Sequence, residues 1–160
     1  MNSEARLRFG GDMDLSAPSG PPRRSGQRTL KGDDMGQVVV ESLYHRLGGY
    51  DAIAAATDDL LARLQSDPQL RDYWKGASTN NQHKARQLIV DFMTEAAGGP
   101  AYYTGRDMKT SHVGMHTDES DWEAFMRHAT ATLDHFGVPS PEKDEVLAFF
   151  ASLKTEIVEG

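Results

Sequence analysis

The residue with the clearest chemical potential is His112, in the middle of the stretch GGPAYYTGRDMKTSHVGMHTDESDW. The chain has no cysteine, which excludes disulfides, thiolate catalysis and cysteine-ligated zinc or iron–sulfur clusters. No His-Glu-x-x-His pair is present. Met108 lies four residues before His112, so one or two helical turns would place both side chains on one face. This local pattern allows two interpretations: a buried structural histidine, or a ligand to a group that the chain does not itself contain.

The elements that would position His112 are helices. Apolar residues recur at three- and four-residue steps from Val40 onward, and Gly-Gly or Asp-Pro pairs interrupt them. No segment alternates with a period of two for long enough to form a strand, so the pattern predicts an all-α protein. The expected helices cover 40–47, 50–66, 82–97, 118–136 and 141–158, with an aromatic turn near 70–74, a polar loop before residue 82 and a short helix near 106–112.

The first 40 residues differ from the rest in composition. Their stretch GGDMDLSAPSGPPRRSGQ combines glycine, serine and proline with almost no apolar residues, which predicts a flexible N-terminal extension over 1–40 and one helical domain over 41–160.

A net charge of −7 argues against nucleic acid as a partner, and no apolar run is long enough to span a bilayer. We therefore expect a cytoplasmic protein with no nucleic-acid or membrane partner. His45, His128 and His135 lie beside charged residues and are expected at the surface.

Several motifs follow one another in an order that resembles a known family. SLYHRLGGYDAI is followed by an acidic helix that closes in DPxLxxYW, then by GGPxYYTGRDMxxxH and by a GVP turn. From about Ser42 to Val158 this order closely resembles the group I truncated hemoglobins. The resemblance implies a truncated globin, which is a two-on-two helical sandwich around heme.

The resemblance also implies how the cofactor, heme b (iron protoporphyrin IX), is held. His112 would be the axial ligand of the iron, and Met108 would pack on the porphyrin face one turn earlier. Arg106 and Lys109 would meet the heme propionates, although solvated surface positions suit them equally well. Trp74 occupies the position where the family carries a heme-contacting aromatic residue. The full set of expected cofactor residues is His112, Met108, Arg106, Lys109, Trp74, Phe92 and Met93.

The chain departs from the family on the distal side of the heme. Many members place a tyrosine donor twelve residues after the first Gly-Gly, and that position here is Leu61. Counting back from Gly98-Gly99-Pro100 places Ala85 and Ile89 in the distal pocket. Counting forward from Tyr73-Trp74 places Gln82 and Arg86 there instead. The backward count preserves the core spacing of the helix, so we favour it and expect an insertion in the loop GASTNN.

On the backward count the distal pocket is largely apolar. The nearest possible donors are Gln82, His83 and Gln87, and His83 could itself ligate the iron in a closed state. A lost hydrogen bond to partly charged dioxygen costs about 1.5–3 kcal/mol, so we expect weaker dioxygen retention and faster autoxidation than in a tyrosine-bearing relative. After His112, the run VGMHT carries His116 and Thr117 where similar chains often have glycine and an aliphatic residue. This change would loosen the turn or supply a pH-sensitive contact.

These expectations favour reversible binding of dioxygen, CO or NO at the heme. The resemblance also brings an enzymatic alternative, nitric oxide dioxygenation, which would need a separate reductase because nothing in the sequence resembles a flavin or nicotinamide domain. A third alternative keeps the helices without the cofactor, as a heme-free interaction module. A heme absorbance spectrum separates the third alternative from the first two, and mixing the oxygenated protein with NO separates those two. We expect a monomer or weak dimer.

Overall fold

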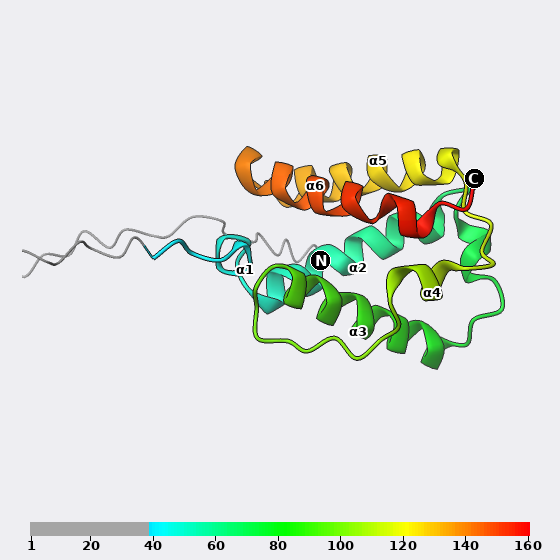
Figure 1. Cartoon of the computed structure of the whole chain (residues 1–160), viewed down its shortest axis with the longest axis horizontal. Coiled ribbons are helices and arrows are strands. Elements are labelled where there is room, and N and C mark those ends of the chain that lie inside the picture. The colour runs from blue at the N-terminus through cyan, green and yellow to red at the C-terminus, as the bar shows by residue number, and fades with distance from the viewer. Residues whose placement is uncertain (1–38) are drawn as a thin grey trace, which may run out of the picture. The chain divides into compact units, whose positions relative to one another are not determined.

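Helices make up the regular structure of residues 39–160, the part of the chain that the structure describes (Figure 1). The structure is a computed structural model. Within the described residues it contains no strand, so the all-α prediction is confirmed. In chain order the elements are α1 (Leu43–Arg46), α2 (Tyr50–Ser66), the 3₁₀ turn η1 (Arg71–Trp74), α3 (Thr79–Ala96), α4 (Met108–His112), α5 (Glu119–His135) and α6 (Ser140–Ile157).

Two helix pairs form the body of this domain. α2 packs on α3, and α5 packs on α6. The pairs meet where α2 contacts α5, while the short α4 packs against α6. In Figure 1 the α5–α6 pair lies above α2 and α3, and α4 lies between α3 and α6. This is the expected two-on-two arrangement, and it brings α4 beside the space between the pairs.

Apolar side chains hold the two pairs together. α2 and α3 meet around Ile53 and the fully buried Val90. α5 and α6 meet around Leu133 and Phe150, and the ring of Phe150 packs edge-on against Phe125 with 5.3 Å between ring centroids. Burying one such side chain is worth about 1.5–3 kcal/mol. The helix pairs are therefore fixed mainly by burial rather than by polar contacts.

Side-chain caps set the first residues of two long helices, α3 and α5. Asp118 accepts a hydrogen bond from the Asp121 N–H at 3.0 Å, and the Asp121 carboxylate accepts one from the Asp118 N–H at 3.3 Å, which completes a capping box for α5. Ser78 accepts from the Asn81 N–H at 3.2 Å, so α3 begins at Thr79. The polar loop expected before residue 82 is therefore shorter than predicted, because its last residues form the first turn of α3.

The first helix is shorter than its apolar pattern predicts. The hydroxyl of Ser42 accepts from the His45 N–H and caps α1 at that point. Val40, where the pattern began the helix, precedes this cap and is 81% exposed. Periodicity extended the helix too far because it carries no information about which residue satisfies the first free N–H groups.

The segment between α3 and α4 begins with a close backbone approach. The Tyr44 N–H donates to the Ala97 carbonyl at 2.8 Å, which ties α1 to the end of α3. A Cβ at Gly99 would lie 2.4 Å from the Tyr44 ring, so only glycine lets the ring pack this close to the backbone. From there the segment runs back beside α3 toward α4 (Figure 1).

The predicted flexible extension over 1–40 lies almost entirely outside the described residues. Within residues 39–160, no helix combines the length and the hydropathy that a membrane crossing requires.

Candidate functional site

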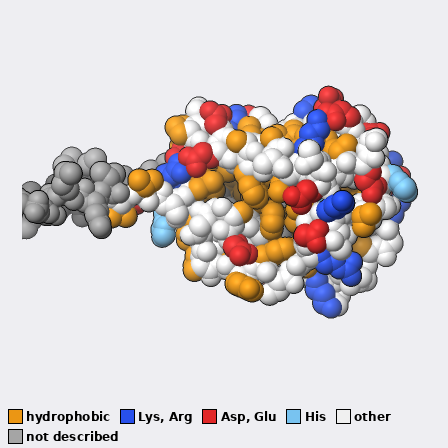
Figure 2. Space-filling view, in the orientation of Figure 1, with side chains coloured by type: hydrophobic (Ala, Val, Ile, Leu, Met, Phe, Trp, Pro, Cys, Tyr) orange, Lys and Arg blue, Asp and Glu red, His pale blue; other side chains and the backbone are white. Residues whose placement is uncertain are grey.

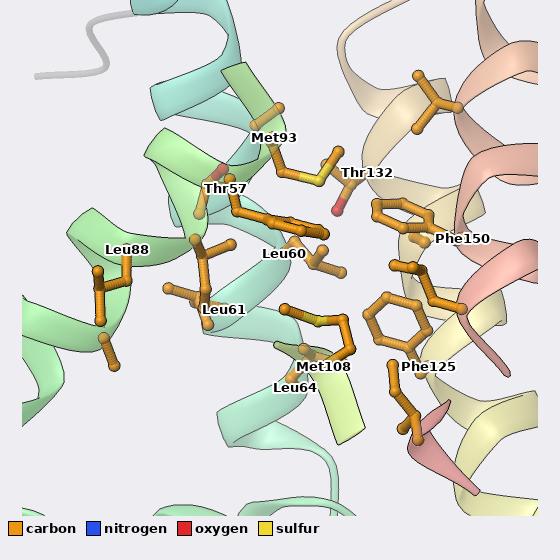
Figure 3. A pocket seen from close by; sticks show the side chains of 18 of the residues that line it. Thr57, Leu60, Leu61, Leu64, Leu88, Met93, Met108, Phe125, Thr132 and Phe150 are labelled. Carbon is orange, nitrogen blue, oxygen red and sulfur yellow. The ribbon is translucent and has the colours of Figure 1, made fainter. Parts of the chain in front are cut away.

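A cavity of about 470 Å³ lies between the helix pairs. Its volume falls in the range of about 300–1,000 Å³ that is usual for cofactor pockets. Side chains from α2 to α6 and from η1 line it, and most of them are apolar. Figure 2 shows apolar side chains in a hollow at the middle of this face, and Figure 3 shows Leu60, Met108, Phe125 and Phe150 converging on the space. The cavity therefore suits a large, mainly apolar ligand.

His112 reaches this cavity from the last position of α4. The Asp107 side chain caps this five-residue helix, accepting from the Thr110 N–H at 2.8 Å and from the Thr110 hydroxyl at 2.7 Å. These hydrogen bonds from Thr110 hold the pKa of Asp107 below its ordinary value. Nδ1 of His112 lies 2.8 Å from the Met108 carbonyl oxygen. A carbonyl oxygen can only accept, so Nδ1 carries the proton and Nε2 keeps a free lone pair.

The segment that leads into α4 is folded around Tyr103. The Tyr103 N–H donates to the Glu95 carboxylate at 2.7 Å, which ties the segment to α3. The Tyr103 hydroxyl donates to the Arg106 carbonyl at 2.6 Å, immediately before α4. A Cβ at Gly105 would lie 2.2 Å from that hydroxyl oxygen, so glycine is needed for the ring to fold back over its own chain. Tyr103 thereby both lines the cavity and fixes the start of α4.

The structure brings most of the expected cofactor residues to one cavity. His112 and Met108 line it from α4, and Trp74 lines it from η1. Phe92 and Met93 line it from α3. Arg106 and Lys109 are exposed and do not belong to the described lining. Their contact with heme propionates therefore stays a prediction, and a solvated position suits them as well.

The residues expected on the distal side also line the cavity where the backward count puts them. Leu61 lies in the lining from α2, and Ala85 and Ile89 lie there from α3. The lining residues of α3 follow steps of three and one that keep them on one helical face. They are Ala85, Leu88, Ile89, Phe92 and Met93. We call three of these residues, Ala85, Leu88 and Ile89, together with Leu60, Leu61 and Leu64 of α2, the aliphatic wall.

Two of the three alternative donors bind other partners, and the third is exposed. The Gln82 side-chain amide donates to the Ala77 carbonyl at 3.1 Å, and the Gln87 amide donates to the Tyr50 hydroxyl at 2.8 Å and to Asp91 at 2.9 Å. His83 is exposed. Of the described residues that line the cavity, none is Gln82, His83 or Gln87. Arg86, the other residue of the forward count, instead forms a paired contact with Asp58 at 2.6 and 2.8 Å.

Sequence reasoning missed the hydroxyl groups that reach the cavity. Thr57 donates to the Ile53 carbonyl at 2.8 Å, and Thr132 donates to the Asp59 carboxylate at 2.7 Å. Figure 3 shows these two threonines near Met93. Because each hydroxyl proton already has a protein acceptor, neither is free to donate to a small ligand. Helical spacing could have indicated Thr57, which lies one turn before Leu61.

Tyr73 is a further lining residue that the sequence did not single out. Its hydroxyl donates to the Asp121 carboxylate at 2.6 Å, and Asp121 also accepts from the Gln69 side chain at 2.7 Å. Burial, followed by this hydrogen bond to Asp121, raises the pKa of Tyr73 to about 12. The contact ties η1 to the first turn of α5 and closes this edge of the cavity.

These features fit the heme that the motifs imply. A porphyrin needs an apolar slot and a neutral imidazole nitrogen for its iron, with solvent or cations near its propionates. The cavity supplies apolar walls, and His112 supplies the nitrogen. Arg106 and Lys109 lie exposed beside and within the short helix that carries His112.

Comparison with known proteins points in the same direction. A family model of bacterial-like globins matches residues 42–159. The group 1 truncated hemoglobin of Mycolicibacterium paratuberculosis is 34% identical over 119 residues, which cover 74% of this chain and 85% of the relative. The group 1 truncated hemoglobin of Tetrahymena thermophila is 34% identical over 97 residues, which cover 61% of this chain and 78% of that relative.

A solved structure shares the fold. The truncated hemoglobin from Tetrahymena pyriformis, in its Fe(III) form, superposes with a TM-score of 0.67 at 25% identity. The match covers 74% of this chain and 98% of that protein. The resemblance drawn from the motifs is thus confirmed by sequence and by fold.

Proposed function

Because the chain belongs to the bacterial-like globins, and among them to the truncated hemoglobins, we propose that it binds dioxygen, CO or NO at a heme iron held by His112. Heme b as the cofactor and a diatomic gas as the ligand follow from the family. Our proposal adds which residue ligates the iron and what kind of pocket receives the gas. One observation carries it: Nδ1 of His112 donates to the Met108 carbonyl, which leaves Nε2 for a metal, and the residue lines the large apolar cavity.

Bound heme would supply an iron that His112 holds and that can bind a diatomic gas. The chain's own residues then have distinct tasks. The hydrogen bond to the Met108 carbonyl fixes the orientation of the His112 ring and its tautomer. Apolar side chains such as Phe92, Phe125 and Phe150 keep water out of the cavity.

We propose that the aliphatic wall is the distal side of the gas site. Leu61 stands where many members carry a tyrosine donor, and Ala85 and Ile89 add further aliphatic surface. Losing one hydrogen bond to partly charged dioxygen costs about 1.5–3 kcal/mol, which is roughly tenfold or more in affinity. Dioxygen should therefore leave faster than from a tyrosine-bearing relative, whereas CO, which carries less charge, should be affected less.

The same wall weighs against the enzymatic alternative. Nitric oxide dioxygenation requires the protein to retain dioxygen until NO arrives, and a wall without a free donor shortens that retention. Stopped-flow mixing of the oxygenated protein with NO tests this point, since rapid and complete formation of nitrate would favour the enzyme.

Spectra of four purified, heme-reconstituted proteins test the proposal: wild type, His112→Gly, His83→Ala and the control His135→Ala, an exposed histidine at the end of α5. We expect a Soret band and a five-coordinate ferrous spectrum for wild type, unchanged in both alanine variants. His112→Gly should lose the histidine-ligated spectrum and regain it with added imidazole. No Soret band in wild type, or a His112→Gly spectrum equal to wild type, would contradict the proposal.

We further propose a cytoplasmic monomer or weak dimer whose iron is kept ferrous by a separate reductase. The acidic composition and the absence of cysteine support this location. Sedimentation velocity over a range of concentrations tests the oligomeric state.

A further inference from the structure

Glu159 lies just beyond α6 and binds the turn that follows α4. Its carboxylate accepts from the Gly114 N–H at 2.6 Å and from the His116 N–H at 2.7 Å. In return, the Glu159 N–H donates to the Thr117 carbonyl at 2.9 Å. These bonds join the end of the described chain to the turn 113–117.

This turn has a backbone conformation that needs support. Gly114 has φ 81° and His116 has φ 56°, and His116 is the non-glycine residue with positive φ in the described chain. Such a conformation is disfavoured for a residue with a Cβ. The two amides share one carboxylate, as neighbouring N–H groups do in main-chain anion sites. Glu159 therefore stabilises a turn that its own residues would hold poorly.

The turn is joined directly to His112. The Met115 N–H donates to the His112 carbonyl at 3.0 Å, and the Val113 N–H donates to the Lys109 carbonyl at 2.9 Å. Met115 and the buried Thr117 line the same cavity as His112. Because α4 has only five residues, a shift of this turn would also shift the end of the helix that carries the ring.

We propose that Glu159 is a positioning residue for the iron ligand: by binding the turn 113–117 it fixes the tilt of the His112 ring and the distance from Nε2 to the iron. The inference rests on the proposed role of His112. Leu153 and Ile157 of α6 line the cavity and α4 packs against α6, so the last residues of the described chain and the ligand-bearing helix meet at one place.

The backbone amides, rather than an ion pair, account for this contact. Nδ1 of His116 lies 3.8 Å from the Glu159 carboxylate, and the His116 side chain is 91% exposed. Exposed ion pairs contribute little. The hydrogen bonds from the Gly114 and His116 amides also hold the pKa of Glu159 below its ordinary value, so the carboxylate is ionised at neutral pH.

The test compares Glu159→Gln with two matched controls in the heme-loaded protein. Glu156→Gln removes the same charge from an exposed position one turn earlier, and His116→Ala removes the imidazole but keeps the amide. Two quantities are measured: hydrogen exchange of the Gly114 and His116 amides by NMR, and the iron–histidine stretching band of the ferrous protein by resonance Raman. In Glu159→Gln we expect exchange at both amides to rise about tenfold or more, with a shifted and broadened band. Both controls should match wild type.

An unchanged iron–histidine band in Glu159→Gln would overturn the inference, even if the amides exchange faster, because the contact would then only stabilise the turn. Different results would contradict the proposed function itself. A wild-type protein without this band, or a band that persists in His112→Gly without added imidazole, would show that His112 is not the ligand.

Discussion

The α4 side of the cavity and the aliphatic wall of α2 and α3 enclose the same space but are specified by different interactions. On the α4 side, Asp107, His112 and Glu159 each bind backbone groups, so a chain of directional hydrogen bonds sets the position of one imidazole. On the other side, Leu61 and Ile89 fill space without directional contacts. The hydroxyls of Thr57 and Thr132, which reach the cavity, are already committed to protein acceptors.

The α4 side therefore depends on precise geometry, whereas the aliphatic wall depends on shape. A metal ligand must be held at one distance and angle, and hydrogen bonds achieve that. An aliphatic surface excludes water and tolerates substitutions of similar volume. The protein should therefore be sensitive to small changes near α4, and it should gain a new ligand preference from a single polar substitution in the aliphatic wall.

The largest expected effect follows from removing the ligand itself. His112→Gly should accelerate heme loss at least about a hundredfold, since even the outer partners of a metal ligand contribute about 10–100-fold. Transfer of heme to an excess of an apoglobin measures the rate. Added imidazole should slow the loss again, and a variant that keeps its heme as long as wild type would argue that another residue ligates the iron.

The second prediction adds a donor to the aliphatic wall. Leu61→Tyr should slow dioxygen dissociation about tenfold or more, because the phenol can donate to dioxygen. Leu61→Phe adds the ring without the hydroxyl and serves as the control. Stopped-flow displacement of dioxygen by CO measures both rates. If the two variants slowed dissociation equally, ring volume rather than a hydrogen bond would be responsible.

The third prediction concerns Tyr73 at the edge of the cavity. Tyr73→Phe should lower the free energy of unfolding at pH 7 by about 1.5–3 kcal/mol, because the hydroxyl donates to the charged Asp121. The folded pKa of Tyr73 is raised to about 12, so its contribution is complete below the unfolded value near 10 and falls as the pH rises from about 10 to 12. Urea unfolding across this range should show wild type approaching the variant. A constant difference between the two proteins would contradict the assignment.

The smallest expected effect is stabilising and lies on α3, away from the ligand. Among the described residues, the Thr94 hydroxyl is the buried side-chain group that has no hydrogen-bond partner. Thr94→Val keeps the shape and removes the unpaired oxygen, so the unfolding free energy should rise by about 1 kcal/mol. Thr94→Ser keeps the hydroxyl but loses a methyl group, so its unfolding free energy should fall. An equal loss of unfolding free energy in both variants would mean that the hydroxyl has a hydrogen-bond partner in solution.

Much of the fold was predictable because it follows from local signals. Helical spacing and the glycines that end α1 and α3 both act over a few residues. The errors also have local causes: Ser42 and Ser78 moved the starts of α1 and α3, because a cap outweighs the apolar pattern next to it.

The contacts that complete the site could not be predicted, because they join residues far apart in sequence. Tyr73 and Asp121 are 48 residues apart, and Glu159 and Gly114 are 45 residues apart. His128, expected at the surface, is half-buried, with Nε2 2.7 Å from the Asp67 carboxylate 61 positions away. Motif order pointed to His112 and to the missing tyrosine at Leu61, and the roles of both residues stay predictions for experiment.

The C–O stretching band in the infrared spectrum of the CO complex shows whether the bound gas has a hydrogen-bond donor, because a donor near the gas lowers its frequency. For wild type we predict one narrow band at the high frequency of CO in an apolar pocket, and a lower band in Leu61→Tyr. A wild-type band already at the low frequency of a hydrogen-bonded CO, with no change in Leu61→Tyr, would contradict this prediction.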